Sequence, residues 1–266
     1  MKKQYKIIMC ISIIVGLIIL LFSENKSNYE IEKHLGIHGR GFKEYAVFYP
    51  QHQDDEVLWG GSAIRQAISQ CGAEKVFVVL VSDGSGVNVF KKKAYENLSR
   101  KEKEELRNKE FRASLKNLGV ESKNIIILPD IDEKEGLHFE LMEKVALDFE
   151  HKYKNVTHIA QSYKYDDHPM HRKNGDVIYN LYKNGEINDC MFFLKPKYIN
   201  KVPIEKRAIY TASSYEDYKV IRSACMEYKI IDTTKQRRGI GYISAHSYFD
   251  KLLKDSSLTS ILHLPY

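Results

Sequence analysis

The chain has 266 residues, 43% of them hydrophobic, so it is long enough to bury one sizeable core. Lys and Arg number 41 against 35 Asp and Glu, a mild basic excess that is compatible with an anionic surface such as a membrane or a cell wall. The basic runs at 91–93 and 237–238 lack interleaved aromatic side chains for stacking on bases, so the composition argues against a nucleic-acid partner.

The first residues carry a targeting signal. Three lysines within the first six residues precede an apolar run at 7–22, which is typical of a secretory signal or a signal anchor. The run is short for a membrane-spanning helix, for which about 17 residues is the lower limit. Since Leu21-Phe22-Ser23 offers no small-residue cleavage site, we expect an uncleaved single-pass anchor at 1–25 in the cell membrane and a tether at 26–41. The domain would then lie outside the membrane. Cleavage would release a secreted form, and a buried core helix is the weaker alternative.

From residue 42 to residue 266, short apolar runs alternate with helical patterns. β-Branched and aromatic residues dominate the runs, and several lack polar alternation, as strands buried on both faces do. Strands are predicted at 45–49, 76–81, 125–128 and 158–161, with weaker candidates at 191–194 and 208–211. Helices are predicted at 56–70, 91–118, 139–153, 173–183 and 215–227, and the stretch at 239–246 as a loop. The pattern favours one Rossmann-like α/β domain, with three α/β/α layers and a mostly parallel sheet.

The first predicted strand leads into an acidic turn. His52, Asp54, Asp55 and Glu56 place one imidazole and three carboxylates within five positions, and such a cluster repels itself unless a cation or water absorbs the charge. His52 and Asp55 are good ligands for a first-row metal, which leaves Asp54 for acid–base work. The alternative is a solvated acidic helix start. The position directly after a buried strand, with glycines at 60 and 61 that allow close backbone approach, favours the metal.

A glycine turn closes the second predicted strand. Asp83 and Gly84 lie there, and loops at the carboxyl ends of parallel strands share one rim, so this turn should border the acidic turn. The two residues could orient a ligand. An ordinary glycine turn is an equal alternative, because the stretch has neither the dinucleotide fingerprint nor the lysine of a phosphate-binding loop.

Two histidines follow the fourth predicted strand. His168 and His171 stand three residues apart, just before a helix, on a loop that should share the same rim. Catalytic zinc commonly takes three nitrogen and oxygen ligands from the protein and keeps one position for water. His52, Asp55 and one of these histidines would supply the three. A single histidine here would more often be a surface or helix-start residue. Two histidines, together with the upstream acidic turn, indicate a metal site more strongly.

The two motifs together resemble a known family. The stretch His52-Gln53-Asp54-Asp55-Glu56, with Gly60-Gly61 behind it and His168-Pro169-Met170-His171 much later, is similar to the PIG-L/LmbE-like deacetylases over roughly residues 44–175. Those enzymes remove acetyl groups from N-acetylglucosamine-type sugars and their conjugates. The resemblance implies Zn²⁺ as the cofactor. It implies zinc ligands at His52, Asp55 and His171, a general base at Asp54, an oxyanion-stabilising group at His168, and substrate contacts from Arg107 and from the turn of Asp83 and Gly84.

The sequence departs from the family pattern at three positions in the motifs. Gln53 stands where proline is usual, which implies a less rigid loop. Met170 stands between the two histidines where an aspartate is usual, which removes a carboxylate from the surroundings of His168. Asp166 occupies the place where close relatives often have an aromatic residue.

The chemistry that follows is hydrolysis of an acetamide on an amino-sugar or glycan substrate. Zinc lowers the pKa of a bound water from about 15.7 to about 7, Asp54 would take its proton, and His168 would stabilise the oxyanion. Two rivals stay open: a metal-containing carbohydrate-binding module with weak catalysis, and a metal-dependent phosphoesterase, which generally needs two metals. The oligomeric state cannot be inferred from the sequence.

Overall fold

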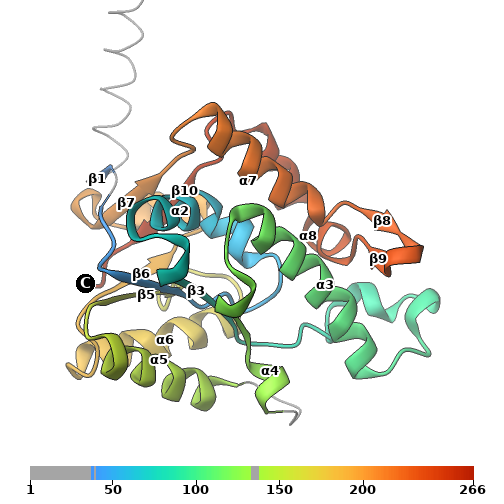
Figure 1. Cartoon of the computed structure of the whole chain (residues 1–266), viewed down its shortest axis with the longest axis horizontal. Helices are drawn as coiled ribbons and strands as arrows, with labels where there is room; N and C mark the ends of the chain where they lie inside the picture. The colour runs from blue at the N-terminus through green and yellow to red at the C-terminus, as the bar shows by residue number, and fades with distance from the viewer. Residues whose placement is uncertain (1–36, 39, 133–137) are drawn as a thin grey trace, which may run out of the picture.

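The computed structural model describes residues 37–38, 40–132 and 138–266, and its centre is an eight-stranded sheet (Figure 1). The strand order is β1-β7-β10-β6-β5-β2-β3-β4. The strands are β1 (Ile37–His38), β2 (Tyr45–Phe48), β3 (Val76–Leu80), β4 (Ile125–Ile127), β5 (Val156–Gln161), β6 (Cys190–Phe193), β7 (Arg207–Tyr210) and β10 (Ser260–His263). Every pair in this sheet is parallel except the two that β10 makes with β6 and β7. The predicted mostly parallel sheet is therefore confirmed.

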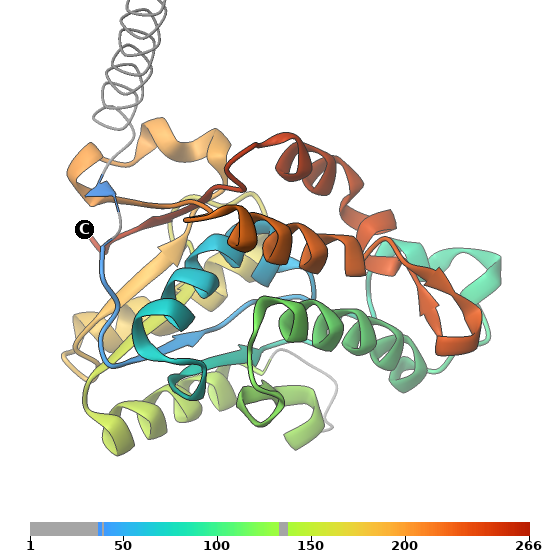
Figure 2. The same ribbon diagram turned by 45° about the horizontal axis from the view of Figure 1, so that its top comes forward.

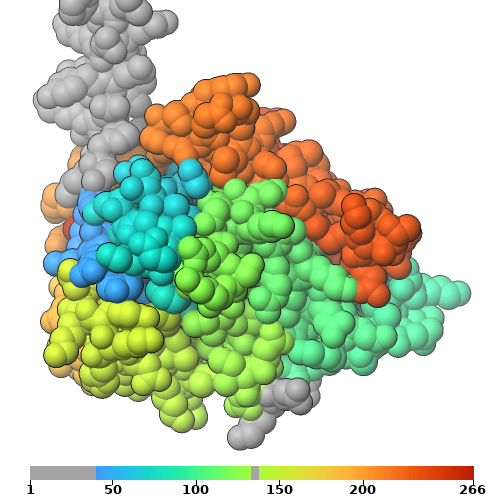
Figure 3. Space-filling view, in the orientation of Figure 1, coloured from blue at the N-terminus to red at the C-terminus, as the bar shows by residue number. Residues whose placement is uncertain are grey.

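Helices cover both faces of the sheet, which gives the predicted three layers (Figures 1 and 2). Helices α5 and α6 lie on one face and pack against each other and against β5; the other long helices lie on the opposite face, where α3 and α7 run side by side (Figure 3). The helices are α2 (Asp55–Cys71), α3 (Arg100–Leu118), α4 (Leu128–Ile131), α5 (Phe139–Tyr153), α6 (Pro169–Lys183), α7 (Tyr215–Glu227) and α8 (Ile240–Lys254).

The central strands are buried on both faces, as their apolar runs predict. In β2, Val47 belongs to the hydrophobic cluster under α5 and α6, and its neighbour Phe48 belongs to the cluster under α2 and α7. Both side chains are fully buried. Successive side chains of a strand point to opposite faces, so a strand between two helical layers needs apolar residues at every position.

Two helix boundaries differ from the predictions for local reasons. The helix predicted from residue 91 begins only at Arg100, where Ser99 and Glu102 form a reciprocal capping box, and short 3₁₀ turns η2 (Asn88–Lys91) and η3 (Lys93–Tyr95) precede it. The helix predicted from residue 173 begins at Pro169, because proline is well suited to the first helical position.

The C-terminal third holds elements that the sequence patterns did not predict. The stretch at 239–246, predicted as a loop, is the start of α8, and β10 follows this helix. A small hairpin of β8 (Ile231–Asp232) and β9 (Arg237–Arg238) also precedes α8. The β10 strand inserts between β6 and β7, so its place depends on pairing with segments 50 or more residues away.

The predicted membrane anchor at 1–25 lies outside the described residues. Among the described helices, none combines the length and the apolar character needed to cross a bilayer. Ile37–His38, which lie within the stretch predicted as a tether, form the edge strand β1 beside β7.

The sheet reverses its strand order beside the predicted site. Strands β4, β3 and β2 run outward to one side, and β5 and β6 continue on the other, so the order turns around between β2 and β5. These two strands are direct neighbours, with Phe48 opposite Ile159. Ligands of open α/β sheets bind at the carboxyl ends of strands at such a reversal. The loop of the acidic turn follows β2 and the histidine loop follows β5, so both predicted motifs leave the sheet at this point.

Candidate metal centre

A pocket of about 430 Å³ opens at the carboxyl ends of β2 and β5. Its walls come from the loops after β2, β3, β5 and β6 and from helices α3 and α8, so six separate segments meet there. The lining residues are His52, Asp54, Asp55, Leu58, Trp59, Ser82, Asp83, Gly84, Gly86, Val87, Arg107, His168, His171, Lys195, Ser244, Ala245 and Tyr248. All eight residues that the sequence proposed for the site are among them.

Three ligand atoms form a small triangle at the bottom of the site. His52 Nδ1 lies 3.0 Å from His171 Nε2, His171 Nε2 lies 3.2 Å from Asp55 Oδ2, and His52 Nδ1 lies 3.4 Å from the same oxygen. A tetrahedral zinc with bonds of about 2.0–2.1 Å holds its ligand atoms about 3.3 Å apart. The three side chains therefore fit a tetrahedral metal that keeps one further position for water or substrate.

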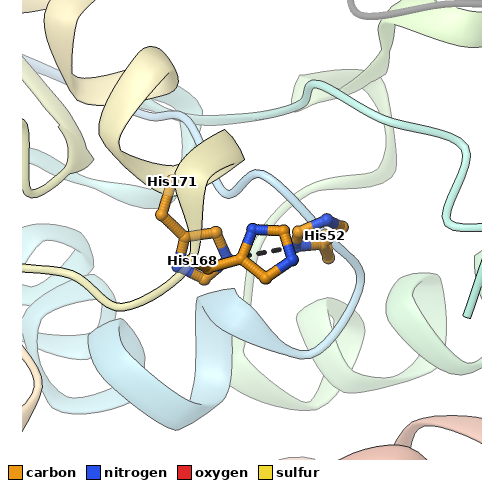
Figure 4. A group of neighbouring side chains, drawn as sticks. All are labelled: His52, His168 and His171. Atoms are coloured by element: carbon orange, nitrogen blue, oxygen red, sulfur yellow. Dashed lines mark hydrogen bonds between the residues drawn. The ribbon is translucent and has the colours of Figure 1, made fainter.

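A third imidazole, that of His168, stands beside this triangle (Figure 4). Ligand atoms of His52, His168 and His171 all lie within 4.8 Å of one another, so the three histidines are an alternative metal set. However, His168 Nδ1 accepts a hydrogen bond of 3.2 Å from the backbone N–H of Met170. In the neutral ring the proton is then on Nε2, which makes that nitrogen a donor rather than a metal ligand. The shorter triangle through Asp55 is the better metal site.

His171 has its ring fixed by a carboxylate. Its Nδ1 lies 3.0 Å from Asp166 Oδ2, which places the proton on Nδ1 and leaves the Nε2 lone pair for the triangle. Burial lowers the pKa of His171, but the carboxylates of Asp55 and Asp166 outweigh it and raise the pKa to about 9. The negative field that favours a proton on this ring would equally favour a divalent cation beside it.

His52 has the opposite tendency. Burial lowers its pKa to about 4, in spite of the hydrogen bond with Asp55. The imidazole is therefore neutral at physiological pH, which is the form that binds metals.

The two neighbouring aspartates are held in different states. Burial would raise the pKa of Asp55, but His171 and His52 keep it well below its usual value; its Oδ1 also accepts a hydrogen bond of 2.9 Å from Trp59 Nε1. Burial raises the pKa of Asp54 well above the usual value, against the opposing charge of Arg107. A pair of carboxylates pushed in opposite directions suits one as an anionic ligand and the other as a proton carrier.

Asp54 has a backbone conformation that non-glycine residues rarely adopt, with φ 110° and ψ −29°. Its N–H donates to Glu56 Oε2 at 2.9 Å, and its Oδ2 accepts from Arg107 Nη2 at 3.0 Å. Glu56 is itself held by Ser114 and Tyr228, whose hydroxyls donate to its Oε1 at 2.8 and 2.7 Å. Such strain persists only where surrounding contacts over-determine it, and it clusters at functional sites. Glu56 thus orients the first motif.

Gln53, which was expected to make the loop less rigid, is hydrogen-bonded to two neighbouring segments. Its Nε2 donates to the Asp83 carbonyl at 2.9 Å and to Asn108 Oδ1 at 2.8 Å. The loop after β2 is thereby attached to the turn after β3 and to α3. These two side-chain hydrogen bonds fix the loop.

The turn at Asp83 and Gly84 borders the acidic turn, as predicted. The Asp83 carboxylate accepts from Arg100 Nε at 2.6 Å and from the Ser85 N–H at 2.7 Å. Gly84 has φ 64°, and a Cβ there would lie 2.2 Å from Gln53 Oε1 and 2.8 Å from Arg107 Nη1. This turn shapes the wall and lets the buried Arg107 reach Asp54. Its contacts with a substrate stay a prediction.

Sequence reasoning missed one part of the pocket wall. Lys195 follows β6, is 7% exposed, and lies with its Nζ 2.8 Å from Asp166 Oδ1. The rings of Trp59 and Tyr248 contact each other edge to face and stand 5.5 and 5.8 Å from the same Nζ. A lysine directly after an apolar strand at the shared rim was a usable signal. Tyr248 could not be placed, because α8 was not predicted.

Solved structures with the same fold include two deacetylases and one enzyme of another class. The N,N'-diacetylchitobiose deacetylase from Pyrococcus horikoshii is 18% identical, with a TM-score of 0.52 over 79% of this chain and 77% of that chain. A triple mutant of a deacetylase of the teicoplanin biosynthetic pathway is 15% identical, with a TM-score of 0.55 over 83% and 97%. The 4-carboxy-2-hydroxymuconate hydratase from Pseudomonas putida is 12% identical, with a TM-score of 0.52 over 83% and 95%. Because a hydratase shares the fold, these likenesses establish architecture and not activity.

Comparison of the sequence with protein families identifies the family of this chain. A search of curated protein sequences finds no significant match. A family model described as "PIG-L: GlcNAc-PI de-N-acetylase" matches residues 47–182, a stretch that contains both histidine motifs. This match spans half of the chain, and the protein therefore belongs to the PIG-L family.

Proposed function

We propose that the protein is a zinc-dependent amide hydrolase that removes the N-acetyl group from an N-acetylglucosamine-type sugar or glycoconjugate. The observation that carries the proposal is the triangle of His52, Asp55 and His171, with Asp54 beside it in the same pocket. Membership of a family described by a de-N-acetylase supports the substrate class. Two of the fold relatives are also named as deacetylases.

The metal would be held by two imidazoles and one carboxylate. This donor set with an open fourth position is typical of hydrolytic zinc sites. When bound, zinc supplies a water with a pKa near 7 and polarises the acetyl carbonyl. His171 and Asp55 are held for this task by Asp166 and Trp59, respectively.

Asp54 is placed to act as the general base. It is buried next to the ligand Asp55 but takes no part in the ligand triangle, and Arg107 fixes one of its oxygens. Its raised pKa suits a group that accepts a proton from water and passes it to the departing amine. General acid–base help of this kind contributes about 10²–10⁴-fold.

His168 is placed to donate a hydrogen bond to the developing oxyanion. Its Nδ1 is occupied by the Met170 N–H, which leaves the Nε2–H as the donor. Its exposed ring lies beside the triangle, with its centroid 5.0 Å from that of His52 and 4.8 Å from that of His171. Loss of one such donor typically costs roughly 3–4 kcal/mol of transition-state stabilisation.

The test combines metal counting with acetate release from N-acetylglucosamine conjugates and chitooligosaccharides. We expect one zinc per chain and stoichiometric release of acetate, with Asp54→Asn keeping the zinc and losing the activity. Full activity in Asp54→Asn would refute the assigned base.

The same measurements separate the two rivals. A carbohydrate-binding module would bind the sugars and release no acetate. A phosphoesterase would hold two metals and hydrolyse phosphate esters instead.

We also propose the location that the N-terminal sequence predicts, with the domain outside a membrane and residues 1–25 as its anchor. The support is the run of lysines followed by the apolar segment. A reporter enzyme that is active only outside the membrane, fused after residue 30, should be active. An inactive reporter that stays in the soluble fraction would refute the anchor.

A further inference from the structure

The Asp166 carboxylate joins three parts of the second half of the site. Its Oδ2 accepts from His171 Nδ1 at 3.0 Å, and its Oδ1 accepts from the His168 N–H at 2.7 Å and from Lys195 Nζ at 2.8 Å. The residue is 7% exposed. One buried carboxylate thus contacts the proposed metal ligand, the backbone of the proposed oxyanion donor and a lysine from another strand.

Lys195 reaches Asp166 from the strand next to it. It follows β6, which pairs with β5 through His158 and Cys190 among others, so the two loops leave the sheet side by side. Its Nζ also lies 2.7 Å from Asp167 Oδ1. A buried lysine and a buried carboxylate are each costly alone, and the pair removes most of that cost when the geometry is good.

Met170 cannot perform the task of a carboxylate near the histidines. A thioether is only a weak hydrogen-bond acceptor, and the contact of Met170 with the site is its backbone N–H on His168 Nδ1. The acceptor for the His171 ring therefore comes from outside the His168–His171 segment, two residues upstream.

We propose that Asp166 is a positioning residue for the metal-ligating ring of His171 and that Lys195 holds it in place. The inference rests on the proposed metal site. A ligating histidine usually donates its other ring N–H to a carboxylate, which fixes its tautomer and orientation and raises its basicity. Asp166 makes that contact, and Lys195 prevents the carboxylate from rotating away.

The chain offers a matched control at the next residue. Asp167 also pairs with Lys195, but its side chain is 46% exposed and its second oxygen is bound by Lys197 rather than by a histidine. Asp166→Asn and Asp167→Asn therefore make the same chemical change beside the same lysine. Only the first changes the group that faces the His171 ring, from a carboxylate to a neutral amide.

The experiment measures zinc affinity in the full-length protein by competition with a chromogenic chelator. We expect Asp166→Asn to weaken zinc binding about 10–100-fold and Asp167→Asn to stay within about threefold of the unmodified chain. Lys195→Met should weaken it by roughly tenfold, and Lys195→Arg, which keeps the charge, should recover most of that loss. In the variants that bind zinc more weakly, the activity at saturating zinc should lie closer to that of the unmodified chain than the activity at limiting zinc.

Several outcomes would overturn the inference without touching the proposed function. If the unmodified chain binds one zinc and Asp166→Asn binds it equally well, Asp166 does not position the ligand. If Lys195→Met raises KM and leaves zinc affinity unchanged, Lys195 contacts the sugar instead. If Asp166→Asn does not fold, the Lys195→Met and Lys195→Arg pair carries the test. Failure of the unmodified chain to bind zinc would instead refute the proposed function.

Discussion

The two loops that build the site differ in how they are held. The loop after β2 and the start of α2 are buried and are held by α3, whose Asn108, Arg107 and Ser114 bond to Gln53, Asp54 and Glu56. The loop after β5 is more open, because His168 and Asp167 are exposed. It depends on Lys195, which is 29 positions from Asp166. The first loop therefore shares its support among several hydrogen bonds from one helix, whereas the anchor of Asp166 outside its own loop is Lys195.

The largest effect is expected from removing a metal ligand, and it should be the same for the loop after β2 and the loop after β5. His52→Ala and His171→Ala each remove one corner of the triangle, so each should lose stoichiometric zinc and lower kcat/KM by roughly 10³-fold or more. Metal analysis and acetate release on the two purified variants check this. If one of them kept its zinc and its activity, the removed histidine would not be a ligand, and both the triangle and the three-histidine set would be wrong.

The support of the second loop should also depend on pH through His263. This buried ring donates from Nδ1 to the Leu264 carbonyl and meets Ser162 Oγ with Nε2 at 2.8 Å. The same Ser162 oxygen accepts the N–H groups of Lys164 and Tyr165, next to Asp166. Burial lowers the pKa of His263 from 6.5 to about 4.

Protonation of His263 therefore favours the unfolded chain. Above pH 6.5 the neutral ring does not lower the free energy of unfolding. As the pH falls from 6.5 toward 4, protonation of His263 in the unfolded chain lowers that free energy by up to about 3 kcal/mol. Urea unfolding between pH 7 and pH 4 should show a shallower decline in His263→Gln than in the unmodified chain. Equal declines would show that His263 is not a source of the acid sensitivity.

The support of the first loop is tested by two glycines in one turn. Gly84→Ala should lower the free energy of unfolding by about 1–3 kcal/mol, because φ is positive there and the new Cβ would collide with Gln53 and Arg107. Gly86→Ala is the matched control, since a Cβ there meets nothing within 4 Å. Chemical denaturation measures both, and equal stabilities would show that the turn does not constrain the acidic loop.

The smallest effect is expected at the hydrogen bond from Trp59 to the ligand Asp55, which corresponds to the bond between Asp166 and His171. Trp59→Phe keeps the packing of the ring and removes the N–H that Asp55 Oδ1 accepts. We expect zinc affinity to fall by about tenfold, at the weak end of the range for such partners. A loss larger than that of Asp166→Asn would mean that the first loop, and not the second, depends more on its outer contact.

The sequence predicted those parts of the site that follow apolar strands. His52, Asp55, His168 and His171 were found because each lies directly after a buried run, and parallel strands place such loops at one rim. Their division into ligands and donor was implied only by the family resemblance. Its physical support, the contacts of the ring nitrogens with Met170 and Asp166, needed coordinates.

Other features depended on contacts between distant segments. The strand β10 is four residues long, and its pairing with β6 and β7 is set by the sheet rather than by local pattern. Helix α8 contains one glycine and two serines in its first half and leaves helical geometry at Ala245, so its helical pattern is weak. The start of α3, by contrast, was present in the sequence as the capping box of Ser99 and Glu102.

The position of β10 has a consequence for the order of synthesis. Among the described strands of the sheet, β10 is synthesised last, yet it lies in the interior between β6 and β7, and its Ser260 also bonds to Ser62 of α2. A nascent chain that stops before residue 260 leaves β6 and β7 with unpaired inner edges. Closure of the sheet therefore waits until residues 260–263 have been synthesised, and until then the inner edges of β6 and β7 can pair with other chains.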